Sequence, residues 1–483
     1  MLQGTGSDVG KTLLVAGLCR IARRRGLKVA PFKPQNMSNN AAVAAHPDGG
    51  TGEIGRAQWL QALACGAAPT VDMNPVLLKP QSDIGAQVIV HGRVAGTAGA
   101  RDYQDLKGRL MGAVMDSWRR LCVDADLVIV EGAGSPAEIN LRDRDIANMG
   151  FATLADVPVV LVGDIDRGGV IAAVAGTHLI LPEEDRRMVA GYLINKFRGD
   201  LSLFDEGLEA ITRFTGWRSF GVVPWLREAA LLPSEDAVVL DRSPPSAAGK
   251  LRVAVPMLPR IANFDDLDPL RAEPEVDVVF VPPGSRLPPD AAVVVIPGSK
   301  ATIADLASLR ALGWADDIVA HVRRGGHVLG LCGGYQMLGR TVADPDRIEG
   351  DDGAAAGLGL LDVDTVLTPE KTVHETRGYS PLFDAPVDGY EIHLGRTDGR
   401  DALRPLVEIG GRAAGAVSPD GRVMGTYLHG LFGSTAFRRA FLARLGVDGG
   451  RFDHRARVED ALEAIADRLE SCLDVEGLLA AAR

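Results

Sequence analysis

The residue of this chain with the clearest capacity for chemistry is Cys332, within the run GLCGG at residues 330–334. Apolar residues 327–329 precede it, and a stretch with helical spacing follows. This pattern predicts a strand, a sharp turn and a helix, and the small flanking residues permit a strained backbone at the apex. The positive end of the helix dipole favours a thiolate there. We therefore interpret Cys332 as a nucleophile rather than a buried structural cysteine.

A nucleophilic cysteine requires a base, and the best candidate is His429 in the run GTYLHG at residues 425–430. His393, in the run YEIH at residues 390–393, is the alternative base, although we favour a packing or substrate-orienting role for it. His327 is interpreted as structural.

A second chemical motif opens the chain, where GTGSDVGKT at residues 4–12 precedes an amphipathic run to Arg25. In such a loop backbone NH groups surround phosphate oxygens, Lys11 neutralises their charge, and the Thr12 hydroxyl reaches Mg²⁺. The spacing is one residue longer than in the common P-loop. Only residues 1–3 precede the loop, so either the strand before it is very short or the true start lies upstream of Met1.

Polar residues follow several predicted strands of this half, and open parallel sheets bind ligands at the carboxyl ends of their strands. Lys33 follows strand 27–31, and its place between Phe32 and Pro34 favours a fixed role. Glu131 follows strand 126–130 and is a candidate metal ligand, with helix capping as the alternative. Asn195 follows strand 189–194, where it either reads a base edge or serves as a turn amide.

The chain length and composition limit the function classes that fit. The 483 residues suggest two to four α/β domains. The net charge of −11 argues against nucleic acid as the main partner. The five scattered cysteines indicate a reducing, cytoplasmic location, and there is neither a signal peptide nor an apolar run long enough to span a membrane.

Longer strings point to specific families. The first half is similar to the dethiobiotin synthetase-like ATP-binding domain, whose P-loop has the same longer spacing. The strings PFKPQNMSNN, MNPVLLKPQSD, VEGAGSPAEINL and INKFRGD resemble the cobyric acid synthase family. In the second half, PGSK, CGGYQMLG, GYEIHLG and GTYLHGLFGS resemble a class I, triad-type glutamine amidotransferase domain of the same family.

The resemblance implies an α/β fold of two doubly wound domains, a P-loop domain followed by a flavodoxin-like amidotransferase domain. We expect an ATP-binding domain at residues 1–232, a linker at 233–250, an amidotransferase domain at 251–445 and a helical extension at 446–483. The apolar spacing of that extension predicts an amphipathic helix that packs on the amidotransferase domain.

The implied activity is ATP- and glutamine-dependent amidation of the b, d, e and g carboxylates of adenosylcobyrinic acid a,c-diamide in cobalamin biosynthesis, with ATP and Mg²⁺ as cofactors. Patterns and resemblance together predict the following site residues: Cys332 and His429 for catalysis; Gly298, Gly333, Tyr390 and His393 for the oxyanion and glutamine; Gly4, Asp8, Gly10, Lys11, Thr12, Lys33 and Asn195 for ATP; Thr12, Glu53 and Glu131 for the metal; and Asn36, Lys79, Arg142 and Asn148 for the corrinoid.

The sequence departs from the amidotransferase pattern at one catalytic position. Many such domains carry Glu two residues after the catalytic histidine, where this chain has Leu431. Either Cys332 and His429 form a dyad, or a carboxylate arrives from elsewhere, and residues 390–393 are the natural place to look for it. The alternative functions are a cobyrinic acid a,c-diamide synthase, another polycarboxylate amide ligase, or a non-catalytic partitioning ATPase with a degenerate amidotransferase module.

Overall fold

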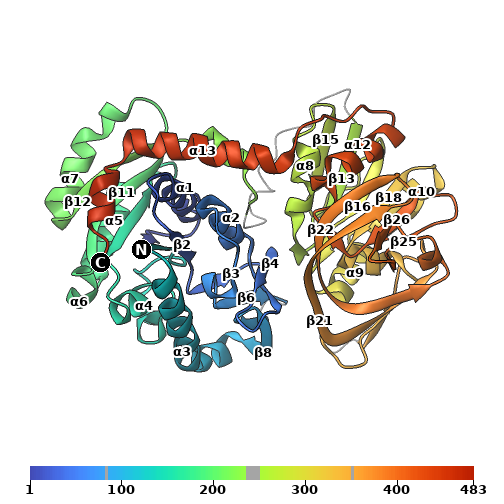
Figure 1. The fold of residues 1–483 in the computed structure, drawn as a ribbon, viewed down its shortest axis with the longest axis horizontal. Helices are drawn as coiled ribbons and strands as arrows, with labels where there is room; N and C mark the ends of the chain where they lie inside the picture. Colours follow the sequence, from blue (N-terminus) through green and yellow to red (C-terminus); the bar gives the residue numbers. More distant parts are fainter. Residues whose placement is uncertain (82–84, 235–250, 350–352) are drawn as a thin grey trace.

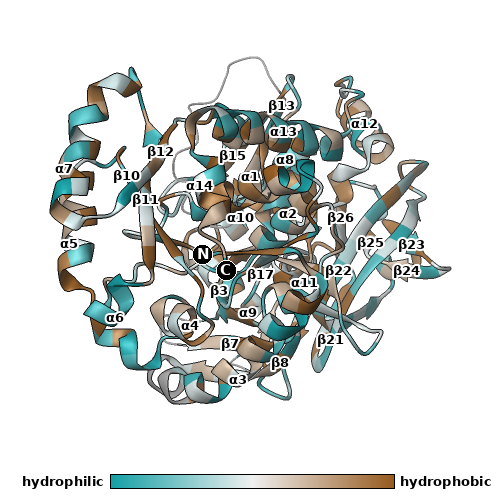
Figure 2. Ribbon diagram, turned by 60° about the vertical axis from the view of Figure 1, so that its left-hand side comes forward, coloured by the Kyte–Doolittle hydropathy of each residue, from teal (hydrophilic) through white to brown (hydrophobic). Residues whose placement is uncertain are grey.

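The computed structural model describes residues 1–81, 85–234, 251–349 and 353–483, which form two α/β lobes (Figure 1). From residue 235 on, the predicted linker lies outside the described residues. Hydrophobic residues line the central strands, whereas a covering helix such as α7 (Asp205–Thr215) carries hydrophilic residues beside hydrophobic ones (Figure 2). Within the described part of the chain, no helix has the length and apolar composition needed to cross a bilayer.

A parallel sheet forms the centre of the first lobe. Its strands run in the order β1 (Leu2–Gly4), β10 (Val159–Asp164), β11 (Val189–Phe197) and β12 (Arg218–Pro224). Strands β2 (Val29–Phe32) and β9 (Leu127–Val130) form a parallel pair, and a bridge between Leu2 and Glu131 links that pair to β1. Strand β1 has three residues in this sequence, and the carboxyl ends of β1 and β9 meet at one edge.

Helices cover this sheet, and smaller strands extend the lobe. The helices are α1 (Lys11–Arg24), α2 (Arg56–Cys65), α3 (Ala100–Asp124), α4 (Met149–Leu154), α5 (Val170–Ile180), α6 (Glu183–Arg186) and α7. Strands β3 (Gln35–Met37), β6 (Val76–Pro80), β7 (Gly85–Val90) and β8 (Arg93–Gly99) form a second sheet, and β4 (Ala41–Ala45) pairs with β5 (Thr51–Gly55).

The second lobe has its own parallel sheet, ordered β15 (Val276–Val281), β13 (Leu251–Pro256), β16 (Val293–Ile296), β18 (His327–Leu331) and β26 (Val423–Thr426), with β25 (Ala416–Val417) antiparallel at the edge. The helices of this lobe are α8 (Asp268–Arg271), α9 (Thr302–Ala311), α10 (Trp314–Arg323), α11 (Gly333–Leu338) and α12 (Thr435–Arg444).

A second sheet of this lobe contains the long antiparallel hairpin of β21 (Val363–Ser380) and β22 (Ala385–Gly399), and β22 also pairs with the short strand β27 (Leu428–His429). Strands β4 and β5 of the first lobe lie against this hairpin. Ala41 and Val43 of β4 and Leu77 of β6 share a hydrophobic cluster with Tyr390 and Ile392 of β22.

The C-terminal helix α13 (His454–Cys472) corrects one prediction. It packs on α1 of the first lobe rather than on the second lobe, as had been expected, and Figure 1 shows it crossing from one lobe to the other. Its buried residues Val458, Leu462, Ile465 and Leu469 join the same hydrophobic core as Leu14 of α1.

Ion pairs flank the apolar contact between α1 and α13. Arg20 of α1 lies 2.7 Å from Glu463 of α13 and also pairs with Glu459, and Arg24 lies 2.6 Å from Asp467. The helix α14 (Val475–Ala480) follows and packs by β12.

Candidate active sites

The turn at Cys332 has the strained geometry that the sequence predicted. Its backbone φ is 50° and ψ is −109°, between the end of β18 and the start of α11. A Cβ atom on Gly334 would lie 2.0 Å from the carbonyl oxygen of Ile296, and one on Gly330 would lie 2.6 Å from the oxygen of Gly334. The glycines therefore permit a close approach of strand and helix that holds the thiol at the apex.

His429 faces a carboxylate that the sequence did not reveal. Its Nδ1 lies 2.7 Å from Oδ2 of Asp266, and the other oxygen of Asp266 accepts a hydrogen bond of 2.7 Å from the backbone NH of Gly430. Asp266 lies in the short 3₁₀ helix η6 (Phe264–Leu267). The sequence feature that could have indicated a catalytic carboxylate here is the cluster of aspartates at residues 265, 266 and 268, set among apolar residues.

The expectation that residues 390–393 supply this carboxylate was wrong. Glu391 accepts a hydrogen bond of 2.7 Å from Arg412 and lies 3.0 Å from His374. Its carboxylate is therefore paired with these two residues and not with His429. Leu431 is buried, and the third member of the site is Asp266.

The protonation of His429 follows from this geometry. Burial lowers the pKa of the imidazole, but the carboxylate of Asp266 and the thiol of Cys332 outweigh burial and raise that pKa to about 10. An imidazolium beside Cys332 stabilises a thiolate. The ring of Tyr390 stacks on His429 with centroids 5.2 Å apart, so it fixes the orientation of the imidazole.

A cavity of about 50 Å³ contains both Cys332 and His429. Gly298 lies beside the histidine, because a Cβ atom on it would sit 3.4 Å from Cε1 of His429. A Cβ atom on Gly333 would sit 2.9 Å from the backbone nitrogen of Ser299, so the two predicted oxyanion segments lie side by side. The cavity is lined by residues of both lobes, including Asn39 and Lys79 from the first and Lys300, Gln336, Glu349, Lys371 and His393 from the second.

His393 lies in the wall of this cavity, but its surroundings favour a neutral ring. It stacks on Tyr427 with centroids 3.8 Å apart, and its nearest carboxylate oxygen, on Glu391, is 4.0 Å away. Burial and the nearby charge of His429 lower the pKa of His393 to about 3. This environment suits a packing or orienting residue better than a proton acceptor paired with a carboxylate.

Glu53 lies in the interface between the lobes. Its Oε2 lies 2.9 Å from Nζ of Lys79, and its Oε1 accepts a hydrogen bond from Lys371 of the second lobe. Burial, partly offset by the charge of Glu53, lowers the pKa of Lys371 to about 7. Glu53 had been predicted to bind the metal together with Thr12 and Glu131. Both of its oxygens contact lysines instead, so the structure does not bring Glu53 to those two residues.

The phosphate loop follows β1 with the expected geometry. Gly10 has a φ of 93°, and a Cβ atom on it would lie 2.3 Å from the amide nitrogen of Asn195. That amide donates a hydrogen bond of 2.8 Å to the carbonyl of Val9, so Asn195 supports the loop. Asp8 also has a positive φ of 58°. At Gly4, a Cβ atom would lie 2.9 Å from Nζ of Lys11.

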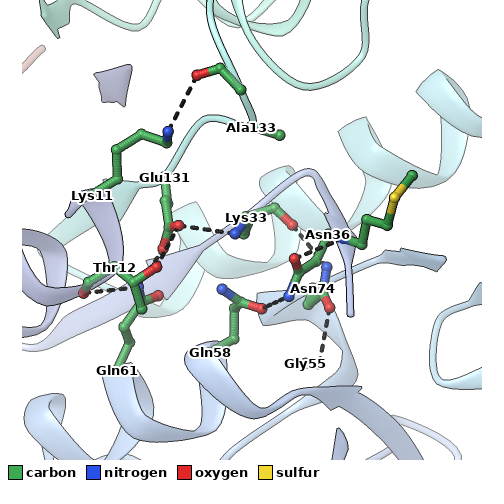
Figure 3. A network of polar contacts seen from close by, with 12 residues as sticks. Lys11, Thr12, Lys33, Asn36, Gly55, Gln58, Gln61, Asn74, Glu131 and Ala133 are labelled. Atoms are coloured by element: carbon green, nitrogen blue, oxygen red, sulfur yellow. Dashed lines mark hydrogen bonds and ion pairs between the residues drawn. The ribbon is translucent and has the colours of Figure 1, made fainter. Parts of the chain in front are cut away.

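A polar network lies beneath this loop (Figure 3). Glu131 accepts hydrogen bonds of 2.8 Å from the Thr12 hydroxyl, 2.9 Å from Lys33 and 2.5 Å from Gln61. Nζ of Lys11 donates to the carbonyl of Gly6 at 3.1 Å. Burial raises the pKa of Glu131, but Lys33, Gln61 and Thr12 outweigh burial and lower it, so this carboxylate is ionised.

This network fits a magnesium ion. A hydroxyl and an ionised carboxylate 2.8 Å apart are hard oxygen donors of the kind that Mg²⁺ prefers. No group of three or more His, Cys, Asp or Glu residues suited to a metal occurs among the described residues. A cation held by Thr12 and Glu131 would therefore take its remaining ligands from phosphate and water.

The four residues predicted to contact the corrinoid are engaged within the protein. Asn36 donates a hydrogen bond of 2.8 Å to Gln58, and Lys79 pairs with Glu53. Arg142 forms a bidentate pair with Asp185 through bonds of 2.7 and 2.8 Å. The Asn148 side chain accepts a hydrogen bond of 3.1 Å from the backbone NH of Ala133. Each of the four therefore has a partner within the protein, and their contact with the corrinoid stays a prediction.

Comparison with known proteins accounts for both lobes. Residues 1–239 match the family described as CobQ/CobB/MinD/ParA nucleotide binding domain, and residues 252–437 match the CobB/CobQ-like glutamine amidotransferase domain. A cobyric acid synthase of Mesorhizobium japonicum is 69% identical over 486 residues, covering 100% of this chain and 99% of the relative. A cobyric acid synthase of Brucella suis biovar 1 is 66% identical over 482 residues, with the same coverage.

Proposed function

Because this chain belongs to the cobyric acid synthase family, we propose that it amidates the b, d, e and g carboxylates of adenosylcobyrinic acid a,c-diamide, using ATP and glutamine, to give adenosylcobyric acid. The enzyme is a glutamine-dependent amidoligase of cobalamin biosynthesis. The observation that carries the detailed proposal is the cavity around Cys332 and His429, because residues of both lobes wall it. We place the reaction in the cytoplasm, where the free cysteines stay reduced.

In the amidotransferase lobe, the thiolate of Cys332 attacks the side-chain amide carbon of glutamine. The carbonyl oxygen becomes an oxyanion, which the backbone NH groups near Gly298 and Gly333 stabilise. His429 then gives its proton to the departing nitrogen, the C–N bond breaks, and ammonia leaves a glutamyl thioester. Water, deprotonated by His429, attacks the thioester, releases glutamate and restores the thiol. Asp266 holds the imidazole in the required tautomer throughout.

In the ATP-binding lobe, a corrinoid carboxylate must be activated because a free carboxylate is a poor acyl donor. Its oxygen attacks the γ-phosphorus of ATP, and the bond to the β-phosphate bridging oxygen breaks, giving an acyl phosphate and ADP. Lys11 neutralises the transferring phosphoryl group, and Thr12 and Glu131 would hold Mg²⁺, which offsets further negative charge. Ammonia then attacks the acyl carbon, the C–O bond to phosphate breaks, and the nitrogen gives a proton to the departing phosphate as the amide forms.

The cavity between the lobes explains why the two chemistries share one chain. Free ammonia is mostly protonated at neutral pH, and ammonium is not a nucleophile. Release of ammonia into a cavity lined by both lobes supplies it on the side of the amidotransferase lobe that faces the ATP-binding lobe.

Two variants test this division of labour with mass spectrometry that counts the nitrogens added to the corrinoid. Cys332→Ala should abolish glutamine-dependent amidation and leave ammonia-dependent amidation within about twofold of the wild type. Lys11→Ala should abolish amidation with either nitrogen source. If Cys332→Ala lost glutamine-dependent and ammonia-dependent amidation equally, the proposal would be refuted. A separate panel of corrinoid substrates with different free carboxylates distinguishes the proposed substrate from those of a,c-diamide synthases.

A further inference from the structure

The loop that carries Asp266 is held by the other lobe. Asn263 begins this loop with a left-handed backbone, at a φ of 51°. Its backbone NH donates a hydrogen bond of 2.6 Å to the side-chain oxygen of Asn40, and its own side-chain oxygen accepts one of 3.0 Å from the NH of Ala41. Asn40 and Asn263 are both buried, so this reciprocal pair of bonds is shielded from water.

A second contact reaches the residue next to Asp266. The guanidinium of Arg56 lies 2.8 Å from Oδ2 of Asp265, with side-chain exposures of 14% and 2%. Arg56 is the first residue of α2, and its backbone NH donates a hydrogen bond of 3.0 Å to the carbonyl of Asn40. The two anchors are thus joined to each other within the first lobe.

Charge makes the Arg56 contact necessary for the loop. Asp265 and Asp266 are adjacent buried carboxylates, and Asp268 is largely buried beside them. Burial raises the pKa of Asp265, and the charge of Arg56 opposes that effect. Without Arg56 the loop would carry an uncompensated buried charge next to the partner of His429, and such a charge either takes up a proton or draws in water.

Arg56 also lies near the other group that orients His429. Its guanidinium is 5.6 Å from the ring centre of Tyr390, whose ring stacks on the imidazole and whose hydroxyl accepts a hydrogen bond of 3.1 Å from Asn263. The first lobe therefore supports both neighbours of the imidazole, the carboxylate and the stacked ring.

We propose that Arg56 and Asn40 of the ATP-binding lobe are positioning residues of the glutamine-hydrolysing site, so that Asp266 and His429 reach their reactive geometry only while the two lobes are docked. The inference rests on the proposed function for the reaction at Cys332. It assigns to the first lobe a part in glutamine hydrolysis in addition to its part in ATP chemistry. Helix α2 then contacts both sites, because its Gln61 reaches Glu131.

The test compares Arg56→Ala, Arg56→Lys and Asn40→Ala in the full-length chain. Each variant is assayed for glutamate release, for amidation with ammonia, and for the rate at which iodoacetamide alkylates Cys332. We expect Arg56→Ala and Asn40→Ala to lower kcat for glutamate release at least tenfold and to slow alkylation. Ammonia-dependent amidation should stay within twofold, and Arg56→Lys should recover part of the lost rate.

Thr51→Val is the matched control, because it removes another hydrogen bond between the lobes, from the Thr51 hydroxyl to the carbonyl of Val373, that does not involve the Asp266 loop. It should leave glutamate release within twofold. Glutamate release within twofold of wild type in Arg56→Ala and Asn40→Ala would overturn the inference, and so would an equal loss of ammonia-dependent amidation. Absence of ammonia-dependent amidation in the wild-type chain would instead count against the proposed function.

Discussion

Replacement of Asp266 by Asn is the sharpest test of the glutamine-hydrolysing site, because it removes one charge and keeps the size of the side chain. The pKa of His429 stands at about 10 against an ordinary value of 6.5. That difference corresponds to a preference of about 5 kcal/mol for the imidazolium, at about 1.4 kcal/mol for each pKa unit. Loss of half of this preference in the transition state would slow the reaction roughly 60-fold, and loss of all of it roughly 3,000-fold.

The assay is glutamate release at saturating glutamine, with ammonia-dependent amidation measured on the same preparation. In Asp266→Asn the rate of glutamate release should be reduced by a factor within the range given above. The rate of amidation with ammonia should stay within about twofold of the wild type. Asp268→Asn is the matched control, since Asp268 belongs to the same segment but lies 3.3 Å from Arg271. It should retain at least a third of the wild-type rate.

A stability measurement adds an independent readout for Asp266→Asn. Since the pKa of His429 is raised in the folded chain, the stabilisation from its protonation is complete below pH 6.5 and disappears as the pH rises toward 10. Urea unfolding should show this alkaline loss in the wild type and much less of it in the variant. Retention of more than half of the glutamate-release rate in Asp266→Asn would refute the role assigned to this carboxylate.

Two further predictions concern stability. Leu469→Ala should lower the free energy of unfolding by about 2–5 kcal/mol, because Leu469 is fully buried between α13 and α1. Urea denaturation, with ammonia-dependent activity as the probe, would measure this loss. A loss below about 1 kcal/mol would contradict the packing described. The pKa of His393 is lowered to about 3, so the folded chain excludes a proton that the unfolded chain binds below pH 6.5. Between pH 6.5 and 5 the wild type should therefore lose about 1.6 kcal/mol more stability than His393→Phe, a variant that keeps the stacking on Tyr427. Equal losses of stability for both proteins in urea titrations would disprove the assignment.

Local patterns were sufficient for the elements that the chain builds from neighbouring residues. The glycines around Cys332 and the β-branched runs of β9 and β10 predict their turn and strands because the steric demands involve only adjacent residues. Thr12 and Glu131 could be paired in advance because a phosphate loop and a strand tip of one parallel sheet must meet at the same edge.

Contacts between distant segments could not be predicted in this way. Asp266 meets His429 only after two lobes and a loop have been positioned, and nothing in the residues around it distinguishes it from Asp265. Glu53 and Arg142 have the residue types of ligand contacts, but each is neutralised by a partner far away in sequence, Lys371 and Asp185. The spacing of α13 shows that one face is buried and does not identify the surface that it covers.

The path of α13 has a consequence for how the chain forms on the ribosome. The hydrophobic core around α1 includes core residues between Val458 and Val475, which are synthesised after the amidotransferase lobe. The nucleotide-binding lobe therefore emerges first but completes its core only after the amidotransferase lobe has been made. The apolar contacts that α13 gives to α1 therefore form only after Cys332 and His429 have been synthesised, so the nucleotide-binding lobe gains this part of its core together with a complete amidotransferase lobe.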